Sequence, residues 1–506
     1  MEFKISKERL EGIKVDIAVV LCQQKTKDKN DKGVAILLKS DGGVALDKLL
    51  GGLLTKIIKS ESFSGEPASH KLVYVDGKIA SKAVLMVGIG KLDEFTLDTS
   101  RKVGARVASV ANNIKARSIA GIIQDESVKK LVPADRIQAL VEGFILGAYK
   151  FDEYKNKKDV EPNTLKNIFL IAGKDASRFE AAIAKGRIIG ESVNYVRKLT
   201  NLPPNDLTPK VLANEAVKTA KDCGLGITVW GPKEIKNAKM GLFMAVAKGS
   251  TNEPRFVQMT YKPKKKAKLK VALIGKGITF DTGGYSLKPP RSMIGMNNDM
   301  AGAATCIGIM KVLGTLKPDI EVTSYLPITD NMIDSKAEVP TSIVKARNGK
   351  TIEITNMDAE GRLILADTLI FASEKKSDLM IDMATLTGGV LYALGEIYTA
   401  VLGNDQKFVE KLLAASRLAG EPSWQLPLAK EYRKSLKEGP ADLRNQAKTR
   451  ADTIGAALFL QEFVGDTKWI HLDIAESAHT EEETLLNRKG ATGVPMRTVL
   501  QFLLSV

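Results

Sequence analysis

Short apolar segments alternate with longer helical ones from residue 167 to the end of the chain, and this alternation restricts the fold more than any other feature. We expect strands at 168–172, 269–274, 379–383 and 469–474, and helices at 299–316, 362–373, 454–464 and 492–504. A long helix should end near Leu202, and the next should begin at Thr208-Pro209, with threonine as N-cap. The pattern predicts βαβ units, and therefore an α/β domain whose mostly parallel central sheet is flanked by helices.

The first 150 residues predict a smaller N-terminal α/β domain. Strands are expected at 17–21 and 83–87, and helices at 99–112 and 135–149. A polar, lysine-rich stretch follows, which suits an interdomain connection but could also be an exposed loop within one domain. We therefore predict an N-terminal domain at 1–150, a linker at 151–166 and a larger domain at 167–506. A length of 506 residues agrees with two or three domains of about 150 residues each.

Cysteine usage and hydropathy predict a cytoplasmic protein. The chain has only three cysteines, Cys22, Cys223 and Cys306, and their wide spacing gives neither a disulfide framework nor a C-x-x-C metal pair. The N-terminus lacks an apolar signal core, and no uncharged apolar run approaches the ~18–20 residues that span a membrane. We therefore expect no membrane association.

The net charge of +16 raises nucleic acid or a membrane surface as a partner, although a lysine-rich solubility surface explains it as simply. The densest basic run is 262–270, between the expected strands 256–261 and 271–274, and it is best explained as an exposed hairpin tip. No aromatic residues interleave with these lysines, so stacking on single-stranded bases is unsupported.

The stretch Asn-Met-Asp-Ala-Glu-Gly-Arg-Leu at 356–363 carries the strongest chemical signal. Asp358, Glu360 and Arg362 stand at i, i+2 and i+4, so in an extended strand they would leave the same face. Two acids that converge from one face are costly unless a cation lies between them. The spacing therefore indicates a cation site with an anion-binding arginine beside it.

A second block supplies the remaining polar groups. Lys276, Asp281 and Lys288 lie in Gly-Lys-Gly-Ile-Thr-Phe-Asp-Thr-Gly-Gly-Tyr-Ser-Leu-Lys at 275–288, and Asp299 follows. The block begins directly after the strand 269–274, at the carboxyl end where open parallel sheets form their sites. With the octapeptide it gives four carboxylates, two lysines and one arginine, an inventory that suits a two-metal hydrolytic site of oxygen ligands.

Each of these residues has a simpler explanation as well. Asp281 could bridge two metals or form an Asx-turn before the glycines. Lys276 could ligate a metal only as the neutral amine, or it could be an exposed or phosphate-binding lysine. Lys288 could stabilise a developing oxyanion. Arg362 could hold a carboxylate or bicarbonate that acts as general base, or it could pair with Asp358 or Glu360.

Other hydrolytic motifs fail. The segment 284–288 has lysine where a G-x-S-x-G elbow needs its second glycine, and a Ser286–Lys288 pair would leave the carboxylates unexplained. His471 and Asp473 could offer two ligands from one strand face, but a satisfied core histidine is the simpler explanation. The chain contains no H-E-x-x-H motif.

These blocks resemble the leucyl aminopeptidase (cytosol aminopeptidase) family. The family's Asn-Thr-Asp-Ala-Glu-Gly-Arg-Leu is present at 356–363 with Met357 in place of threonine, and similar blocks stand at 275–288, 299–304, 384–388 and 490–493. The resemblance is dense from about 167 to 500 and faint before 150. It implies that 167–506 is a catalytic dimetal aminopeptidase domain.

The resemblance also implies roles for seven residues. Asp281 and Glu360 would bridge two divalent metals, Asp358 would complete one metal shell, and Lys276 with Asp299 the other. Lys288 would polarise the scissile carbonyl, and Arg362 would hold bicarbonate, the general base that takes a proton from a bridging water. The expected protein is a homohexamer that uses Mn²⁺ or Zn²⁺, with cobalt a further metal of the family, and removes leucine and other apolar residues from the N-termini of peptides.

Three departures from the family pattern leave the site's surroundings open. Met357 is expected to change packing rather than activity, Asn297 and Asn298 precede Asp299, and residues 476–479 replace the usual Gly-Thr-Ala-Trp. Two other functions remain alternatives: DNA binding, which some bacterial members of the family show and the charge permits, and two-metal phosphoesterase activity.

Overall fold

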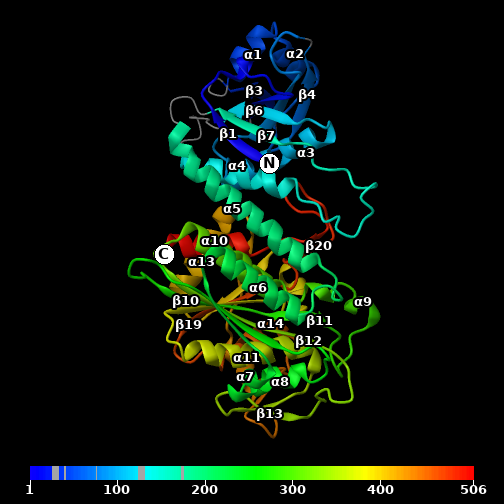
Figure 1. Ribbon diagram of the computed structural model, residues 1–506, viewed down its shortest axis with the longest axis vertical. Coiled ribbons are helices and arrows are strands. Elements are labelled where there is room, and N and C mark those ends of the chain that lie inside the picture. The colour runs from blue at the N-terminus through cyan, green and yellow to red at the C-terminus, as the bar shows by residue number, and fades with distance from the viewer. Residues whose placement is uncertain (26–32, 39–41, 76, 123–130, 172–175) are drawn as a thin grey trace. The chain divides into compact units, whose positions relative to one another are not determined.

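The computed structural model describes residues 1–25, 33–38, 42–75, 77–122, 131–171 and 176–506 (Figure 1). The chain forms two compact units. One consists of Met1–Asn194 with Glu483–Arg488, and the other of Tyr195–Glu482 with Lys489–Val506. The division falls inside the long helix α5, Ala176–Asn201, which ends close to the expected Leu202.

A seven-stranded sheet forms the centre of the first unit, in the order β1-β7-β6-β2-β5-β4 with β3 beside β2. Its strands are β1 Glu2–Ser6, β2 Ile17–Lys25, β3 Val34–Leu37, β4 His70–Tyr74, β5 Ala83–Gly90, β6 Ser118–Ile122 and β7 Asn167–Ile171. β3 and β4 are antiparallel to their neighbours, and the other pairs are parallel. All eight residues of β5 are buried, as expected of a strand covered on both faces.

Besides the first part of α5, the described helices of this unit are α1 Gly43–Leu49, α2 Leu53–Ser60, α3 Leu97–Asn113 and α4 Pro133–Gly147, with a 3-10 turn η1 at Leu10–Gly12. α3 and α4 confirm the expected helices 99–112 and 135–149 within two residues. Their apolar faces pack on the sheet through Val103, Val107, Val141 and Phe144. The first unit is therefore an α/β domain, as the sequence indicates.

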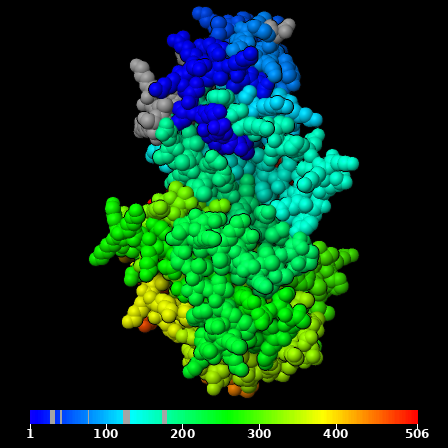
Figure 2. All heavy atoms as spheres, viewed as in Figure 1, coloured from blue at the N-terminus to red at the C-terminus, as the bar shows by residue number. Residues whose placement is uncertain are grey.

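The expected domain boundary at 166/167 does not coincide with the division of the structure. β7 was expected to open the larger domain, but it pairs in parallel with β1 and β6 and belongs to the first sheet. The segment 151–166 contains no helix or strand and is mostly exposed; it forms part of the outer surface in cyan (Figure 2). It connects α4 to β7 inside one unit, so the alternative of an exposed loop is correct. Composition alone cannot separate these two cases, because both are polar.

A nine-stranded mixed sheet forms the centre of the second unit, in the order β17-β16-β19-β15-β10-β12-β9-β8, with β11 beside β12. Its strands are β8 Gly226–Trp230, β9 Arg255–Tyr261, β10 Lys270–Gly275, β11 Gly277–Asp281, β12 Glu321–Asn331, β15 Leu379–Ala384, β16 Thr399–Gly403, β17 Ser423–Gln425 and β19 Lys468–Asp473. The four central strands β19, β15, β10 and β12 are mutually parallel. Val271–Ile274 of β10 are all buried, which explains their continuous apolar sequence.

Helices cover both faces of this sheet, with α6 and α10 on one face and α7, α8 and α11 on the other (Figure 1). The helices are α6 Pro209–Cys223, α7 Pro232–Asn237, α8 Gly241–Ala247, α9 Pro290–Met293, α10 Ala301–Leu316, α11 Glu360–Ser373, α12 Gly389–Leu394, α13 Gln406–Ala419, α14 Asp452–Gln461 and α15 Met496–Ser505. Thr208 is the N-cap residue of α6, as expected, although its side chain makes no capping hydrogen bond. The remaining elements are short: β13 Ile343–Lys345, β14 Thr351–Glu353, β18 Leu443–Arg444, β20 His479–Thr480, β21 Gly490–Ala491, and the 3-10 turns η3 Met296–Asn298, η4 Met357–Ala359 and η5 Lys430–Leu436.

Two details of this unit bear on partner predictions. The basic run 262–270 is not a hairpin tip, because β12 lies between β9 and β10 and the run joins two strands that are not neighbours. The stretch Pro290–Leu316 is long and apolar enough to cross a membrane by length and composition, yet 83% of its most apolar window is buried. Its helix α10 packs on β10, β12 and β15, so its hydropathy reflects a place in the protein core.

Candidate metal centre

Asp281 ends β11, and a glycine turn fixes its carboxylate. Gly283 has a φ of +83°, which favours glycine, and its backbone N–H donates a 2.8 Å hydrogen bond to Oδ1 of Asp281. The amide nitrogen of Asn331, the last residue of β12, donates to the same oxygen at 2.8 Å. Asp281 therefore does form an Asx-turn, and Oδ2 of the same carboxylate takes no part in it.

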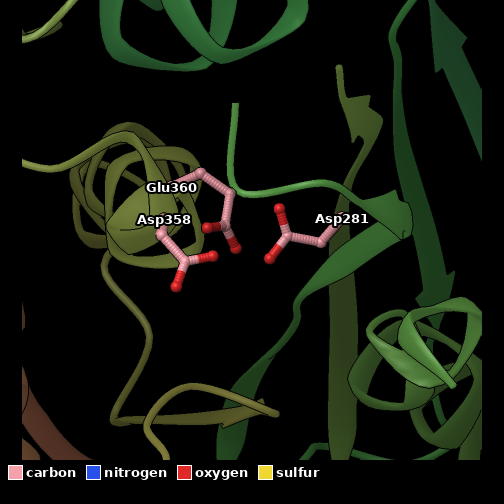
Figure 3. Close-up of side chains that lie close together, drawn as sticks. All are labelled: Asp281, Asp358 and Glu360. Carbon is pink, nitrogen blue, oxygen red and sulfur yellow. The ribbon is translucent and has the colours of Figure 1, made fainter. Parts of the chain in front are cut away.

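The octapeptide is not an extended strand. Asn356 caps the turn η4 by accepting a 2.8 Å hydrogen bond from the N–H of Asp358, and α11 begins at Glu360. Asp358 and Glu360 thus stand at a helix N-terminus, where the helix dipole favours negative charge. They still converge: one oxygen from each of Asp281, Asp358 and Glu360 lies within 4.8 Å of the others (Figure 3).

Two lysines separate the carboxylates. The ammonium group of Lys276 lies 2.7 Å from Asp299 and 2.9 Å from Glu360, and it donates to the backbone oxygen of Thr385 at 2.7 Å. The ammonium group of Lys288 lies 2.9 Å from Asp281 and 2.5 Å from Asp358. The structure thus brings together the four acids and two lysines that the sequence singled out.

Burial dominates the electrostatics of the chain without a cation. Burial raises the pKa of Glu360 to about 8 and the pKa of Asp299 to about 6, and the charge of Asp281 adds to both shifts. Burial lowers the pKa of Lys276, but the carboxylates of Asp299 and Glu360 outweigh it, so the net shift is upward. The lysine is therefore an ammonium ion in the cation-free chain, and it could ligate a metal only after losing a proton.

The carboxylates keep lone pairs that no hydrogen bond uses. Among the described residues, Oδ2 of Asp299 and Oε2 of Glu360 are buried without a hydrogen-bond partner. A buried carboxylate oxygen in this state is costly unless a cation is nearby. Divalent cations with oxygen ligands would satisfy these atoms, so the side chains present fit the metal site that the sequence indicates.

Arg362 is 3% exposed and does not pair with either acid of its own motif. One terminal nitrogen donates to the backbone oxygen of Asn445 at 3.0 Å, and the other lies 3.5 Å from Asp452. Its Nε–H has no hydrogen-bond partner within the described part of the chain. The alternative explanation of Arg362, an ion pair with Asp358 or Glu360, is therefore wrong, and a donor remains for an anion.

The rival assignments find no support in the geometry. The Ser286 hydroxyl accepts a 2.9 Å hydrogen bond from the N–H of Met357, and Lys288 is engaged by two carboxylates. His471 is fully buried, and its Nδ1 lies 2.6 Å from Asp382. Asp473 accepts from the Thr387 hydroxyl at 2.7 Å. The histidine is a core residue whose Nδ1 is paired with Asp382, whereas its Nε2 has no hydrogen-bond partner among the described residues.

Comparison with known proteins decides the family. Residues 194–500 match the catalytic domain of the cytosol aminopeptidase family, and residues 33–158 match the N-terminal domain of the same family. The chain belongs to the cytosol aminopeptidase family. Membership implies a peptidase hydrolase that removes N-terminal residues and depends on two metal ions, in agreement with the carboxylate cluster.

Relatives support this assignment over the full length. A probable cytosol aminopeptidase of Sulfurihydrogenibium sp. (strain YO3AOP1) is 39% identical and covers 100% of this chain and 98% of its own length. One of Persephonella marina is 40% identical over 91% of this chain and 93% of its own. Among solved structures, the bottromycin maturation enzyme BotP in complex with Mn is similar, with a TM-score of 0.84 and 31% identity over 97% of this chain and 99% of that one.

The departures from the family pattern lie around the site rather than in it. The Met357 side chain is 2% exposed and packs in the apolar core, which fits a change of packing. The amide of Asn297 donates to the backbone oxygens of Thr200 and Leu202, so it ties η3 to the end of α5. Burial raises the pKa of Glu476, with the charge of Asp473 adding to it.

Sequence reasoning missed the residues that support the acids. Asn331 holds Asp281, and the fully buried Asn445 accepts from the N–H groups of Thr355 and Asn356 at 2.8 and 3.3 Å. Thr385, by contrast, lies in the block 384–388 that the sequence singled out, and its hydroxyl donates a 2.6 Å hydrogen bond to Asp299. Asn331 could have been found as a polar residue that ends a long buried strand. Asn445 stands in a loop-rich segment that offers no comparable signal.

Proposed function

We propose that this chain is a leucyl aminopeptidase that prefers leucine and other apolar residues at the N-terminus of peptides. The observation that carries the proposal is the convergence of three carboxylate oxygens within 4.8 Å, next to two lysines. The preference for leucine rests on the resemblance of the octapeptide to that of leucyl aminopeptidases.

Each of the seven site residues has a distinct role in the proposed reaction. Lys276, Asp281, Asp299, Asp358 and Glu360 would hold two divalent cations, Mn²⁺ or Zn²⁺. Such cations supply Lewis acidity and a nucleophile at neutral pH. The Lys288 ammonium would stabilise the developing oxyanion of the scissile carbonyl. Arg362 would hold bicarbonate through its Nε–H, and that anion would accept a proton from the water molecule that attacks the scissile carbonyl.

We also propose a homohexamer in the cytoplasm. The location rests on the name of the relatives, cytosol aminopeptidase. Five exposed apolar side chains around α12 and the edge strands β16 and β17, hereafter the apolar patch, support assembly; they are Leu391, Tyr392, Ile397, Tyr398 and Trp424, which are 37%, 92%, 68%, 40% and 62% exposed. Trp424 lies in β17 opposite Ala400 of the neighbouring strand β16, and Ala400 is two residues from Tyr398 in the sequence. An apolar patch on a sheet edge is typical of a protein interface. Binding of DNA, which the net charge of +16 permits, remains an untested alternative.

Hydrolysis of leucine p-nitroanilide by purified protein tests the proposal. Protein stripped of metal with a chelator should be inactive, and Mn²⁺ or Zn²⁺ should restore turnover. Glu360→Ala and Lys288→Ala should each lower kcat/KM by at least about a hundredfold, because each removes a group that acts on the reacting atoms.

Glu410→Ala and Lys411→Ala on α13 are matched controls, since both side chains are exposed and lie in a helix that contributes none of the site residues. They should keep wild-type turnover. Turnover of phosphate esters but not of amino-acid amides would favour the phosphoesterase. Hydrolysis of other amino-acid amides but not of leucine amides would contradict only the side-chain preference. Turnover that does not depend on added bicarbonate would contradict only the role given to Arg362.

A further inference from the structure

A concave basic pocket lies on the second unit, between the α7–α8 segment and the β13–β14 turn. Its volume is about 680 Å³, within the range of ligand sites, roughly 300–1,000 Å³. The lining includes five cationic side chains, Lys236, Lys239, Lys248, Lys345 and Arg347, and no acidic residue from the described part of the chain. The partly buried Met244 supplies apolar surface, and the fully buried Met240 lies beneath it. None of the seven site residues lines this pocket.

Three of the five cations are not neutralised. Lys248 pairs with Glu338 at 2.5 Å, and Arg347 pairs with Glu374 through two nitrogens, at 3.0 and 2.7 Å. By contrast, within the residues that the structure describes, the ammonium groups of Lys236, Lys239 and Lys345 make no hydrogen bond or ion pair, and all three residues are exposed. Three unpaired ammonium groups around one concavity repel one another and attract a polyanion.

The walls of the pocket are fixed before any ligand binds. The buried carboxylate of Asp367 in α11 accepts hydrogen bonds from the N–H of Leu242 at 2.8 Å, Phe243 at 3.1 Å and Arg347 at 2.8 Å. It thereby joins the start of α8 to the β13–β14 turn. Gly241 allows the close approach, because a Cβ there would lie 2.2 Å from the backbone oxygen of Lys345. A preorganised wall lowers the entropic cost of binding.

The unpaired cations of the pocket are ammonium groups rather than guanidinium groups, and this difference favours phosphate over carboxylate as the ligand. Among the described residues Arg347 is the only guanidinium in the lining, and it is already paired with Glu374, so its two nitrogens are not available to bind a carboxylate of a ligand. The unpaired groups are lysines, which act on phosphate as movable point charges. No aromatic side chain of the part of the chain that the structure describes lines the pocket, so a nucleobase would find no stacking partner there. We propose that this pocket binds a small oligophosphate anion, through Lys236, Lys239 and Lys345.

Isothermal titration of the full-length protein with sodium tripolyphosphate at physiological salt tests this site. The pocket variant carries Lys236→Gln, Lys239→Gln and Lys345→Gln. The control variant carries Lys264→Gln, Lys265→Gln and Lys266→Gln, three exposed lysines of the β9–β10 connection. Both variants lose the same net charge and keep the same metal site, so general attraction and chelation of site metals cancel between them. Both should melt at the wild-type temperature.

We expect the pocket variant to bind tripolyphosphate at least about tenfold more weakly than wild type, and the control variant to stay within about twofold. Equal weakening in both variants would show general electrostatic attraction and would overturn the proposal. So would the absence of binding to wild type. Binding of duplex DNA that the pocket substitutions abolish and tripolyphosphate fails to displace would assign the pocket to a nucleic acid instead.

Discussion

At the scale of single residues, the site depends on how closely Lys276 can approach the start of α11. A Cβ added at Gly361 would lie 2.6 Å from Cε and 2.8 Å from Nζ of Lys276, closer than van der Waals contact allows. The glycine of the octapeptide is therefore required by the lysine rather than by the helix, in which glycine is otherwise unfavourable. The lysine end is flexible, so an added methyl group would displace it without unfolding the domain.

Gly361→Ala should lower kcat/KM for leucine p-nitroanilide by about ten- to a hundredfold, because a displaced Lys276 disturbs the groups that hold the cations. The melting temperature should change little, since alanine favours the helix. Gly12→Ala is the control, because a Cβ there meets nothing within 4 Å. Wild-type activity and metal content in Gly361→Ala would show that Lys276 is not a ligand.

The raised carboxyl pKa values predict how stability and metal binding depend on pH. A carboxyl group whose folded pKa is raised stabilises the folded state below its ordinary value, near 4, and this contribution is lost as the pH rises through the folded pKa, here about 6 for Asp299 and about 8 for Glu360. Metal-stripped protein should therefore melt several degrees lower at about pH 8.5 than at about pH 5.5.

Saturating Mn²⁺ or Zn²⁺ should reverse this trend, because cations bind the deprotonated carboxylates and acid competes with them. Thermal melts followed by circular dichroism, with chelator and with metal, test both the pH trend of the stripped protein and its reversal by metal. Glu360→Gln should flatten the pH dependence of the stripped protein. A stripped protein that gains stability on going from the lower to the higher pH would contradict the buried, proton-binding state of these acids.

At the scale of elements, the chemistry of the octapeptide could be predicted but its backbone could not. The spacing of Asp358 and Glu360 suits one face of a strand, yet Leu363–Ala366 continue a helix and Asn356 caps the turn before it. A pair of acids two residues apart is also what a helix N-terminus favours, so the spacing alone cannot separate the two. β10 was predictable because it is a continuous apolar run, and α10 because it is long and apolar.

Asn445 shows how one loop residue can position the motif. Its side chain accepts hydrogen bonds from Thr355 and Asn356 and donates one of 2.6 Å to the backbone oxygen of Asn356, all from a fully buried site beside β18. Asn445→Ala should lower the free energy of unfolding by about 2–4 kcal/mol, because it leaves several buried groups without partners. It should also lower kcat/KM.

Urea unfolding of this variant beside Asn237→Ala measures the effect, since Asn237 is exposed at the end of α7 and its loss should cost less than about 0.5 kcal/mol. If Asn445→Ala were as stable as the control, water would have to satisfy the freed groups, and the loop would not depend on this side chain.

At the scale of the whole molecule, the two α/β units were foreseeable and their division was not. Alternating strands and helices run through both halves, so periodicity shows the fold class but not which sheet a strand joins. β7 joins the first sheet through pairing with β1, 165 residues earlier in the chain by the register Glu2↔Asn167. Such a long-range pairing leaves no local trace in the sequence, whereas β10, β15 and β19 of the second sheet could be predicted from their apolar runs.

The last prediction concerns assembly. If the apolar patch is an interface between copies of the chain, the wild-type protein should have a mass about six times 54.8 kDa by light scattering after size exclusion. Ile397→Asp with Trp424→Asp should reduce this mass, because each places an unpaired charge where an apolar contact was buried. Leu49→Asp is the control, since Leu49 is also exposed, at 56%, but lies on α1 in the first unit.

A wild-type protein that stays monomeric at micromolar concentration would make the hexamer wrong and leave the patch exposed in solution. An intact hexamer in the double variant would instead move the interface to another surface.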